Sequence, residues 1–268
     1  MNPGIPGIHH IGDVGIDVLG NVSIRGLAAL KQPGHPAMER VAATCSKCGA
    51  PITASRFFAP LTACDACIEK HLLEEKQIKF RDYWHEICPP GFRDTKTDHP
   101  QFPRAQWELL KEFAGKENLL FYGPSRTGKT RVALHLLKRC LLKSGMYVSV
   151  LWPEQLKDVK HAMNRLQRIE ALGRVELLLL DDALLTGAQD ERLTDFLKDL
   201  IDYRLRQQVF SIITSQIGSE DYIEQAGKFE QPTKADLQRV KALLARIKES
   251  YRVISFVQAT PVAGEAAF

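Results

Sequence analysis

The sequence predicts an α/β fold built on a parallel sheet, preceded by a small cysteine-rich module. Three observations lead to this prediction. Apolar strand-like runs alternate with helical patterns from about Gln106 to Val257, a glycine-rich turn follows the first run, and two pairs of cysteines come before it. Strands that alternate with helices form parallel sheets covered on both faces. We therefore expect an α/β domain over residues 105–258 and a zinc module over 41–75.

The remaining segments separate these parts. The strands are expected at 119–123 (LLFYG), 146–152 (MYVSVLW), 176–182 (ELLLLDD), 209–216 (VFSIITSQ) and 251–257 (YRVISFV). Prolines in 88–103 interrupt a helical pattern, so we place a helix and a linker in 76–104. Residues 1–40 are rich in glycine and proline without a hydrophobic period, which indicates a flexible leader, and 259–268 form a tail.

Composition limits the classes of protein. The chain has 268 residues, 44% hydrophobic and 25% charged, as expected of a globular protein. Its longest apolar runs, such as 177–180 (LLLL), are far shorter than the roughly 20 residues of a membrane-spanning helix. The first residues do not resemble a secretory signal, so we expect a cytoplasmic protein without a membrane partner. A net charge of +4 does not by itself indicate a nucleic-acid partner.

The turn at 123–130 (GPSRTGKT) matches the phosphate-binding pattern G-x-x-x-x-G-K-[ST] between an expected strand and an expected helix. Its amides would converge on phosphate oxygens at the helix N-terminus. Lys129 would reach the β and γ phosphates of ATP, and Thr130 would hold Mg²⁺. The alternative is a chance strand-turn-helix corner. The predicted nucleotide-binding residues are Gly123, Pro124, Ser125, Arg126, Thr127, Gly128, Lys129, Thr130 and Asp181.

Polar side chains end two later strands. Asp181 would lie close to Mg²⁺, directly or through an intervening ligand, and Asp182 would polarise the attacking water. The alternative for this pair is a cap on the next helix. Thr214, Ser215 and Gln216 end the following strand and would orient the water or contact the γ phosphate, although polar residues end most strands.

Together these motifs resemble the AAA+ ATPases of the DnaC/DnaI helicase-loader and IstB transposition-helper group. The resemblance runs from Phe92 to Val257 and includes FRDT (92–95), GPSRTGKT, LLLLDD, IITSQ and LLARIKESYRVISF (243–256), in the order of that group. It implies a P-loop AAA+ domain without a C-terminal lid. The implied catalytic residues are Lys129, Asp182, Gln216 and Arg246, the last as a finger reaching the nucleotide of a neighbouring subunit.

Two departures from the wider AAA+ class bear on the expected rate of ATP hydrolysis. Asp182 stands where many members carry glutamate, and Gln216 stands where asparagine is commoner. We therefore expect slow, assembly-stimulated hydrolysis. For Arg246 the alternative is an ordinary charge on a solvated helix face.

The cysteine pairs predict a zinc site. Cys45, Cys48, Cys64 and Cys67 form C-x2-C-x15-C-x2-C, which supplies a closed tetrahedral and therefore structural site. A helix beginning near Ile68 would make the module a treble clef or a zinc ribbon. His35 and His71 are alternatives for one ligand. Cys88 and Cys140 fall outside the pattern, and core packing is expected for Cys140.

A basic helix is expected after the second strand of the domain. Lys157, Lys160, His161, Arg165 and Arg168 recur at helical spacing in 153–172. The hypothesis is that Lys157, Lys160, Arg165 and Arg168 contact the backbone of single-stranded DNA. A solvated face is the alternative.

The resemblance implies an ATPase that needs ATP, Mg²⁺ and Zn²⁺, forms a homo-oligomer on binding ATP, and acts in DNA replication as a helicase-loader-like factor. Zinc modules bind nucleic acid or protein, and protein docking is favoured here because Arg56 is the one basic residue between the cysteine pairs. The resemblance implies the replicative helicase as the docking partner. One alternative is an IstB-like transposition helper that binds duplex DNA and a transposase. Another is a nucleotide-gated adaptor with negligible hydrolysis.

Overall fold

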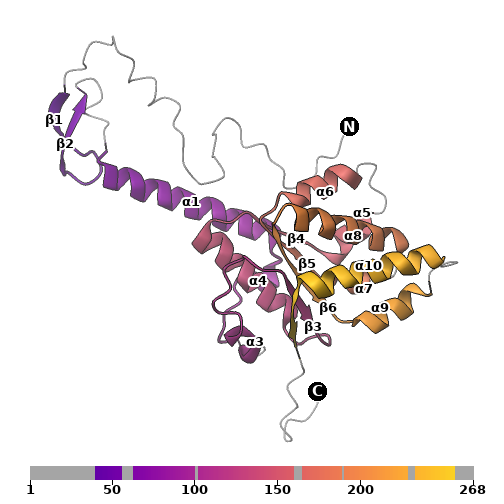
Figure 1. Ribbon diagram of the computed structural model, residues 1–268. Helices are drawn as coiled ribbons and strands as arrows, with labels where there is room; N and C mark the ends of the chain where they lie inside the picture. The colour runs from indigo at the N-terminus through magenta and orange to yellow at the C-terminus, as the bar shows by residue number, and fades with distance from the viewer. Residues whose placement is uncertain are drawn as a thin grey trace, which may run out of the picture. The chain divides into compact units, whose positions relative to one another are not determined.

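The computed structural model describes residues 40–55, 63–99, 102–159, 165–188, 190–228 and 233–256. The chain divides into two compact units, Met1–Glu86 and Ile87–Phe268, which we describe separately (Figure 1). The predicted leader, apart from Arg40, and the predicted tail lie outside the described residues. Within the described ranges, no helix is both long and apolar enough to cross a membrane.

The first unit contains a hairpin and a long helix. Strands β1 (Arg40–Thr44) and β2 (Pro51–Ser55) pair antiparallel, with Thr44 opposite Pro51, so that the first cysteine pair lies in the connecting turn. Helix α1 (Asp65–Ile87) begins at the second pair rather than near Ile68. Most of its side chains are exposed, including the apolar Leu72 and Leu73, and Trp84 is its buried side chain. Both cysteine pairs are therefore placed at the ends of regular elements.

The second unit is a parallel sheet, as the sequence predicts. Its strands are β3 (Leu119–Tyr122), β4 (Val148–Leu151), β5 (Leu177–Leu180), β6 (Phe210–Ser215) and β7 (Arg252–Ser255). They lie in the order β4-β5-β6-β3-β7, and every neighbouring pair is parallel. Each strand falls within one of the five predicted apolar segments. The prediction of an α/β fold is confirmed.

The strand order fixes where the motifs meet. Strand β6 lies between β3, which leads into the phosphate turn, and β5, which leads into the acidic pair. The register places Tyr122 opposite Ser215 and Leu180 opposite Ile213. Because the carboxyl ends of parallel strands share one edge of the sheet, residues that follow β3, β5 and β6 come together there.

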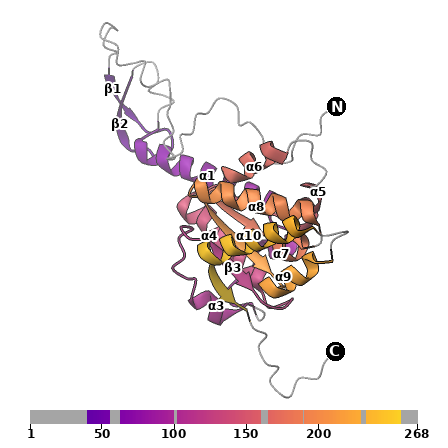
Figure 2. The same ribbon diagram turned by 45° about the vertical axis from the view of Figure 1, so that its right-hand side comes forward.

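Helices cover both faces of this sheet. They are α2 (Pro90–Arg93), α3 (Arg104–Glu108), α4 (Lys129–Arg139) with a π-helical turn (Cys140–Ser144), α5 (Pro153–Val159), α6 (Arg165–Gly173), α7 (Ala183–Gly187), α8 (Glu191–Arg206), α9 (Ser219–Ala226) and α10 (Lys234–Ser250). Helices α8 and α10 lie side by side (Figures 1 and 2). The segment predicted as one basic helix contains α5 and α6, with 160–164 outside the described residues.

The main core lies between the sheet and the pair α8 and α10. Leu178 and Leu180 of β5 contribute to it together with buried residues of both helices, such as Phe196 and Leu243. The intervening residues Leu177 and Leu179 are also fully buried. Since successive side chains of a strand point to opposite faces, β5 is covered on both sides, and α4, which packs against β5 and β6, covers the other face.

The proline-rich segment before the sheet is attached to α4. Lys138 Nζ donates to the Arg93 carbonyl at 2.6 Å, and the Arg131 guanidinium donates to the Thr95 hydroxyl at 3.3 Å. The same guanidinium lies over the ring of Phe92, 5.4 Å from its centroid. Residues of the FRDT stretch therefore hold the helix that begins at the phosphate turn.

A buried arginine joins the ends of several elements at the amino ends of the strands, opposite the edge of the sheet where the motifs meet. Arg204 is 1% exposed, and its Nε donates to the Ser211 hydroxyl at 2.8 Å. The remaining guanidinium nitrogens donate to the carbonyls of Leu172, Val175 and Phe210. Burial lowers the pKa of Arg204 to about 10. Because such a group is costly to bury without partners, these bonds fix α8 against β6 and the end of α6.

Candidate nucleotide site and candidate metal centre

The turn between β3 and α4 has the backbone that its glycines allow. Gly123 and Gly128 have φ values of 149° and 87°, and Arg126 between them has a φ of 63°. A Cβ on Gly123 would lie 2.0 Å from the Phe256 carbonyl oxygen, so no side chain fits there. The turn thus folds back over the end of the sheet before Gly128, the residue preceding α4.

Lys129 lies at the centre of this turn. Its side chain is 5% exposed, and Nζ donates to the carbonyls of Gly123 and Pro124 at 2.7 and 2.6 Å. Burial lowers the pKa of Lys129, while the nearby carboxylates of Asp182 and Asp181 act in the opposite direction. A buried ammonium surrounded by the loop's own carbonyls has the placement needed to bind phosphate oxygens entering the turn.

Asp181 joins the turn to β5. The Thr130 hydroxyl donates to Asp181 Oδ1 at 2.8 Å, and the Thr214 hydroxyl donates to the same oxygen at 2.8 Å. Burial raises the pKa of Asp181, and the two hydroxyl donors partly offset that effect. A carboxylate beside a threonine hydroxyl is a donor set that Mg²⁺ prefers, since this ion takes oxygen ligands from one or two carboxylates and from phosphates. The residues therefore fit magnesium.

Asp182 has an unusual backbone. It precedes α7 with a φ of 44°, yet its side chain makes no capping bond to that helix. Its carboxylate Oδ2 instead accepts a hydrogen bond from Gln216 Nε2 at 2.6 Å. The alternative in which the acidic pair caps the next helix is therefore wrong for Asp182.

Gln216 bridges the acidic pair and the phosphate turn. While its amide nitrogen donates to Asp182, its Oε1 accepts a hydrogen bond from the Ser125 hydroxyl. Ser215, one residue earlier, donates its hydroxyl to the Ile217 carbonyl within its own loop. Of these three polar side chains, that of Gln216 is hydrogen-bonded to the phosphate turn, whereas Ser215 contacts the turn through its backbone carbonyl, which accepts the Gly123 N–H at 3.2 Å.

Thr214 has contacts that the sequence does not predict. We expect from sequence alone a group that orients water or touches the γ phosphate. In the structure its hydroxyl donates to Asp181 and accepts from the Asp182 backbone N–H, both at 2.8 Å. The signal that points to it is indirect: a threonine at the end of the strand that lies between the two motif-bearing strands.

Arg246 is placed on α10. Its Nε lies 3.2 Å from Asp202 Oδ1 and its Nη1 3.6 Å from Glu249 Oε2, and its side chain is 55% exposed. Both partners belong to the same chain. The role of Arg246 toward a neighbouring subunit stays a prediction.

The predicted DNA-contact residues have different surroundings. Lys157 on α5 is exposed, whereas Lys160 lies outside the described residues. Arg165 on α6 pairs with Asp199 at 2.6 Å. Burial lowers the pKa of Arg168, and its Nε is buried without a hydrogen-bond partner among the described residues. Lys157 is therefore the described member of this set whose charge is most accessible.

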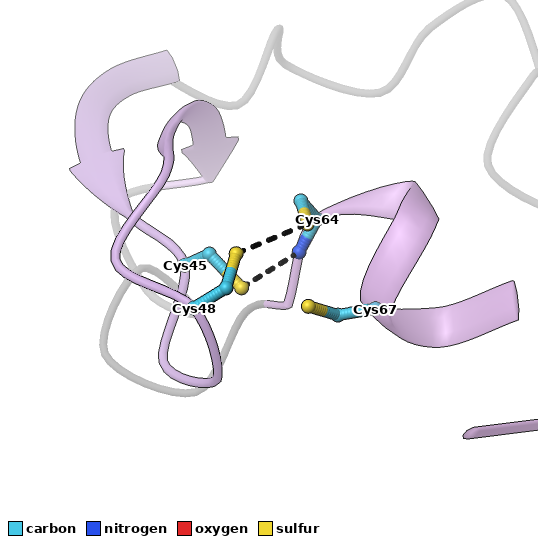
Figure 3. Close-up of side chains that lie close together, drawn as sticks. All are labelled: Cys45, Cys48, Cys64 and Cys67. Atoms are coloured by element: carbon cyan, nitrogen blue, oxygen red, sulfur yellow. Dashed lines mark hydrogen bonds between the residues drawn. The ribbon is translucent and has the colours of Figure 1, made fainter. Parts of the chain in front are cut away.

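The four cysteines of the first unit converge on one point (Figure 3). Their sulfur atoms all lie within 4.8 Å of one another, and Cys48 Sγ and Cys64 Sγ are 3.7 Å apart. Four sulfurs at about 2.3 Å from a zinc ion would be about 3.8 Å apart, so the cluster fits tetrahedral zinc. Cys45 and Cys48 come from the hairpin turn, and Cys64 and Cys67 from the start of α1.

Backbone donors prepare this cluster for thiolates. The N–H groups of Cys64 and Lys47 donate to Cys45 Sγ at 3.2 and 3.4 Å. Backbone donors from Cys64, Cys48 and Lys47 lower the pKa of Cys45 to about 6, whereas hydrogen bonds to the neighbouring cysteines raise the pKa of Cys67 to about 12. Four thiolates this close repel one another, so a dication is needed to ionise them all.

The other candidate ligands lie elsewhere. His71 is exposed on α1 and faces Glu75 at 3.6 Å, and His35 lies outside the described residues. Cys88 and Cys140 are buried and do not belong to the cluster. Residues 56–62, which include Arg56, also lie outside the described residues.

Comparison with known proteins yields structural similarity only. No protein-family model matches the sequence, and no curated protein matches it. Among solved structures, the chain is similar to DnaI, with 17% identity and a TM-score of 0.45 over 62% of this chain and 86% of that one.

It is also similar to the DnaC helicase loader, with 18% identity and a TM-score of 0.45 over 60% of this chain and 93% of the other. It is similar as well to AMPPCP-bound DnaA from Aquifex aeolicus, with 14% identity and a TM-score of 0.42 over 63% of this chain and 50% of that one. At these identities the similarity concerns the fold alone.

Proposed function

We propose that this chain binds and slowly hydrolyses Mg-ATP as an AAA+ protein that acts in DNA replication in the manner of a helicase loader. One observation carries the proposal: the Thr130 hydroxyl of the phosphate turn and the buried Asp181 carboxylate meet at 2.8 Å, beside a buried lysine. A phosphate cradle, an ammonium and a magnesium ligand pair in one place are the parts that nucleotide triphosphate binding requires.

Each residue has a distinct role in this proposal. The backbone N–H groups of the turn and Lys129 bind the phosphates, and Thr130 and Asp181 hold Mg²⁺. When bound, Mg²⁺ neutralises charge on the phosphate oxygens. Asp182 orients the attacking water and accepts its proton, and Gln216 sets the direction of the Asp182 carboxylate.

Hydrolysis by a single subunit is proposed to be slow for two reasons. One oxygen of the Asp182 carboxylate already accepts a hydrogen bond from Gln216, which weakens it as a base. The positive charge that stabilises the transferred phosphoryl group comes from Arg246 of a neighbouring copy. Arg246 is exposed and pairs with carboxylates at its own surface, so it is accessible for this exchange. ATP binding and assembly are thereby coupled.

The proposal includes two further contacts, one with a partner protein and one with DNA. The cysteine module, with zinc held by Cys45, Cys48, Cys64 and Cys67, docks on the replicative helicase. Lys157, exposed on α5, contributes to binding single-stranded DNA through phosphate contacts.

Replacing Lys129 tests nucleotide binding. Lys129→Ala removes charge-assisted hydrogen bonds worth about 1.5 to 3 kcal/mol, so we expect at least tenfold weaker binding of a fluorescent ATP analogue with Mg²⁺. Lys143→Ala, which removes an exposed lysine after α4, is the matched control. Equal affinity of both variants and the wild type would contradict the proposal.

A mixing experiment tests the arginine in trans. Arg246→Ala subunits keep an intact nucleotide site, and Lys129→Ala subunits keep an intact Arg246. The mixture is therefore expected to hydrolyse ATP several times faster than either variant alone, in a phosphate-release assay. In the control, Lys248→Ala subunits take the place of the Arg246→Ala subunits. Lys248→Ala should hydrolyse ATP as the wild type does. A mixture no faster than the sum of its parts argues against the trans role.

Loss of cysteine ligands tests the metal centre. Purified wild-type protein is expected to carry about one zinc ion per chain, and Cys64→Ser should lose it, as measured by mass spectrometry of the metal content. Cys88→Ser and Cys140→Ser alter buried cysteines outside the cluster and should keep the zinc. If docking needs the module, Cys64→Ser also loses capture of purified replicative helicase. Retention of both zinc and helicase by Cys64→Ser would refute this part.

Reversing the charge of Lys157 tests the DNA contact. Lys157→Glu is expected to weaken binding of labelled single-stranded DNA several-fold and to reduce the salt dependence of the affinity, because a phosphate contact is lost. The measurement is fluorescence anisotropy at two salt concentrations. Lys143→Glu, which reverses the charge of an exposed lysine after α4, is the control. An unchanged affinity and salt slope for Lys157→Glu would exclude this residue.

A further inference from the structure

We propose that Thr214 is a positioning residue that fixes the Asp181 carboxylate and the backbone of Asp182 at the same time. The inference rests on the proposed function, because it assigns to Thr214 the task of keeping the magnesium ligand and the water-orienting carboxylate in register.

The hydrogen bonds of Thr214 use both capacities of its hydroxyl. The side chain is fully buried on β6, donates its one hydrogen to Asp181 Oδ1, and accepts the Asp182 N–H, each at 2.8 Å. A hydroxyl can donate once and accept twice, so this single group satisfies a buried carboxylate oxygen and a buried amide together. Valine would fill nearly the same space without forming either bond.

The backbone of Asp182 explains why such a clamp is needed. A φ of 44° lies in the left-handed region, which is unfavourable for a residue with a side chain. A strained conformation persists only where its surroundings hold it. Three bonds hold Asp182: Thr214 at its N–H, Gln216 at its carboxylate, and the Thr186 N–H at its carbonyl. Without the Thr214 hydroxyl, the first of these is lost.

Thr214 also closes a chain of hydrogen bonds that starts and ends in the phosphate turn. We call this the acid-turn chain, and its members in order are Ser125, Gln216, Asp182, Thr214, Asp181 and Thr130. Thr214 is the link between the two carboxylate-bearing residues. A displacement of the turn on nucleotide binding would therefore reach Asp181 and Asp182 together.

A second buried threonine offers a matched comparison. Thr194 on α8 is 2% exposed, and its hydroxyl donates to the Gly187 carbonyl at 3.1 Å and pairs with the Tyr222 hydroxyl at 2.8 Å. It makes as many hydrogen bonds as Thr214 but none to the acid-turn chain. Thr194→Val should therefore reproduce the loss of stability without the effect on the site.

The experiment compares Thr214→Val, Thr214→Ser and Thr194→Val in the full chain. For Thr214→Val we expect about a tenfold rise in the Mg²⁺ concentration that half-saturates ATP hydrolysis, because the Asp181 carboxylate loses the hydroxyl donor that orients it. Binding of the fluorescent ATP analogue in EDTA should stay within about twofold of the wild type, since Lys129 and the turn are unchanged. Thr214→Ser keeps the hydroxyl and should match the wild type.

Thr194→Val is expected to lower the melting temperature by a similar amount to Thr214→Val and to leave the Mg²⁺ requirement unchanged. The inference is overturned if Thr214→Val and Thr194→Val show the same Mg²⁺ requirement, or if Thr214→Ser behaves like Thr214→Val. Thr214→Ala provides the same comparison where Thr214→Val does not fold. A wild-type protein that binds no nucleotide overturns the proposed function as a whole, whereas the other failures concern Thr214 alone.

Discussion

The buried carboxylate of Asp181 is the constraint around which the second unit is organised. A charge at this depth is tolerated only with partners, and its partners come from two other parts of the chain: Thr130 at the start of α4 and Thr214 at the end of β6. Those three residues meet because β6 lies between β3 and β5 in a parallel sheet. The hydrogen bonds that satisfy Asp181 therefore depend on the order of the strands in the sheet.

The rest of the unit keeps this edge rigid. The FRDT stretch contacts α4 through Arg93, Thr95 and Phe92, and these contacts oppose sliding of the helix along the sheet. Arg204 fixes α8 against β6 near the opposite edge. These contacts fix the helix and the strand that border the site. Hydrogen-bond donors that are already fixed in place need little rearrangement to stabilise a negative charge.

Much of this could be predicted from sequence because the signals are local. The five apolar segments, the GPSRTGKT turn and the cysteine spacing each depend on neighbours in the chain, and the structure contains the strands, the turn and the cysteine cluster. What sequence could not supply depends on which strands are adjacent. The hydrogen bond of Thr214 to Asp181 and the pairing of Arg165 with Asp199 join residues 33 and 34 positions apart. Charge spacing alone would have placed Arg165 in solvent.

The end of the sheet limits the space available to the phosphate turn. Phe256 donates its N–H to the Tyr122 carbonyl at 2.7 Å, and its own carbonyl occupies the space where Gly123 would carry a side chain. The residue that follows β7 therefore lies directly against the phosphate turn. An insertion or deletion just after Ser255 would displace the Phe256 carbonyl and so change the space available to the phosphate turn at Gly123.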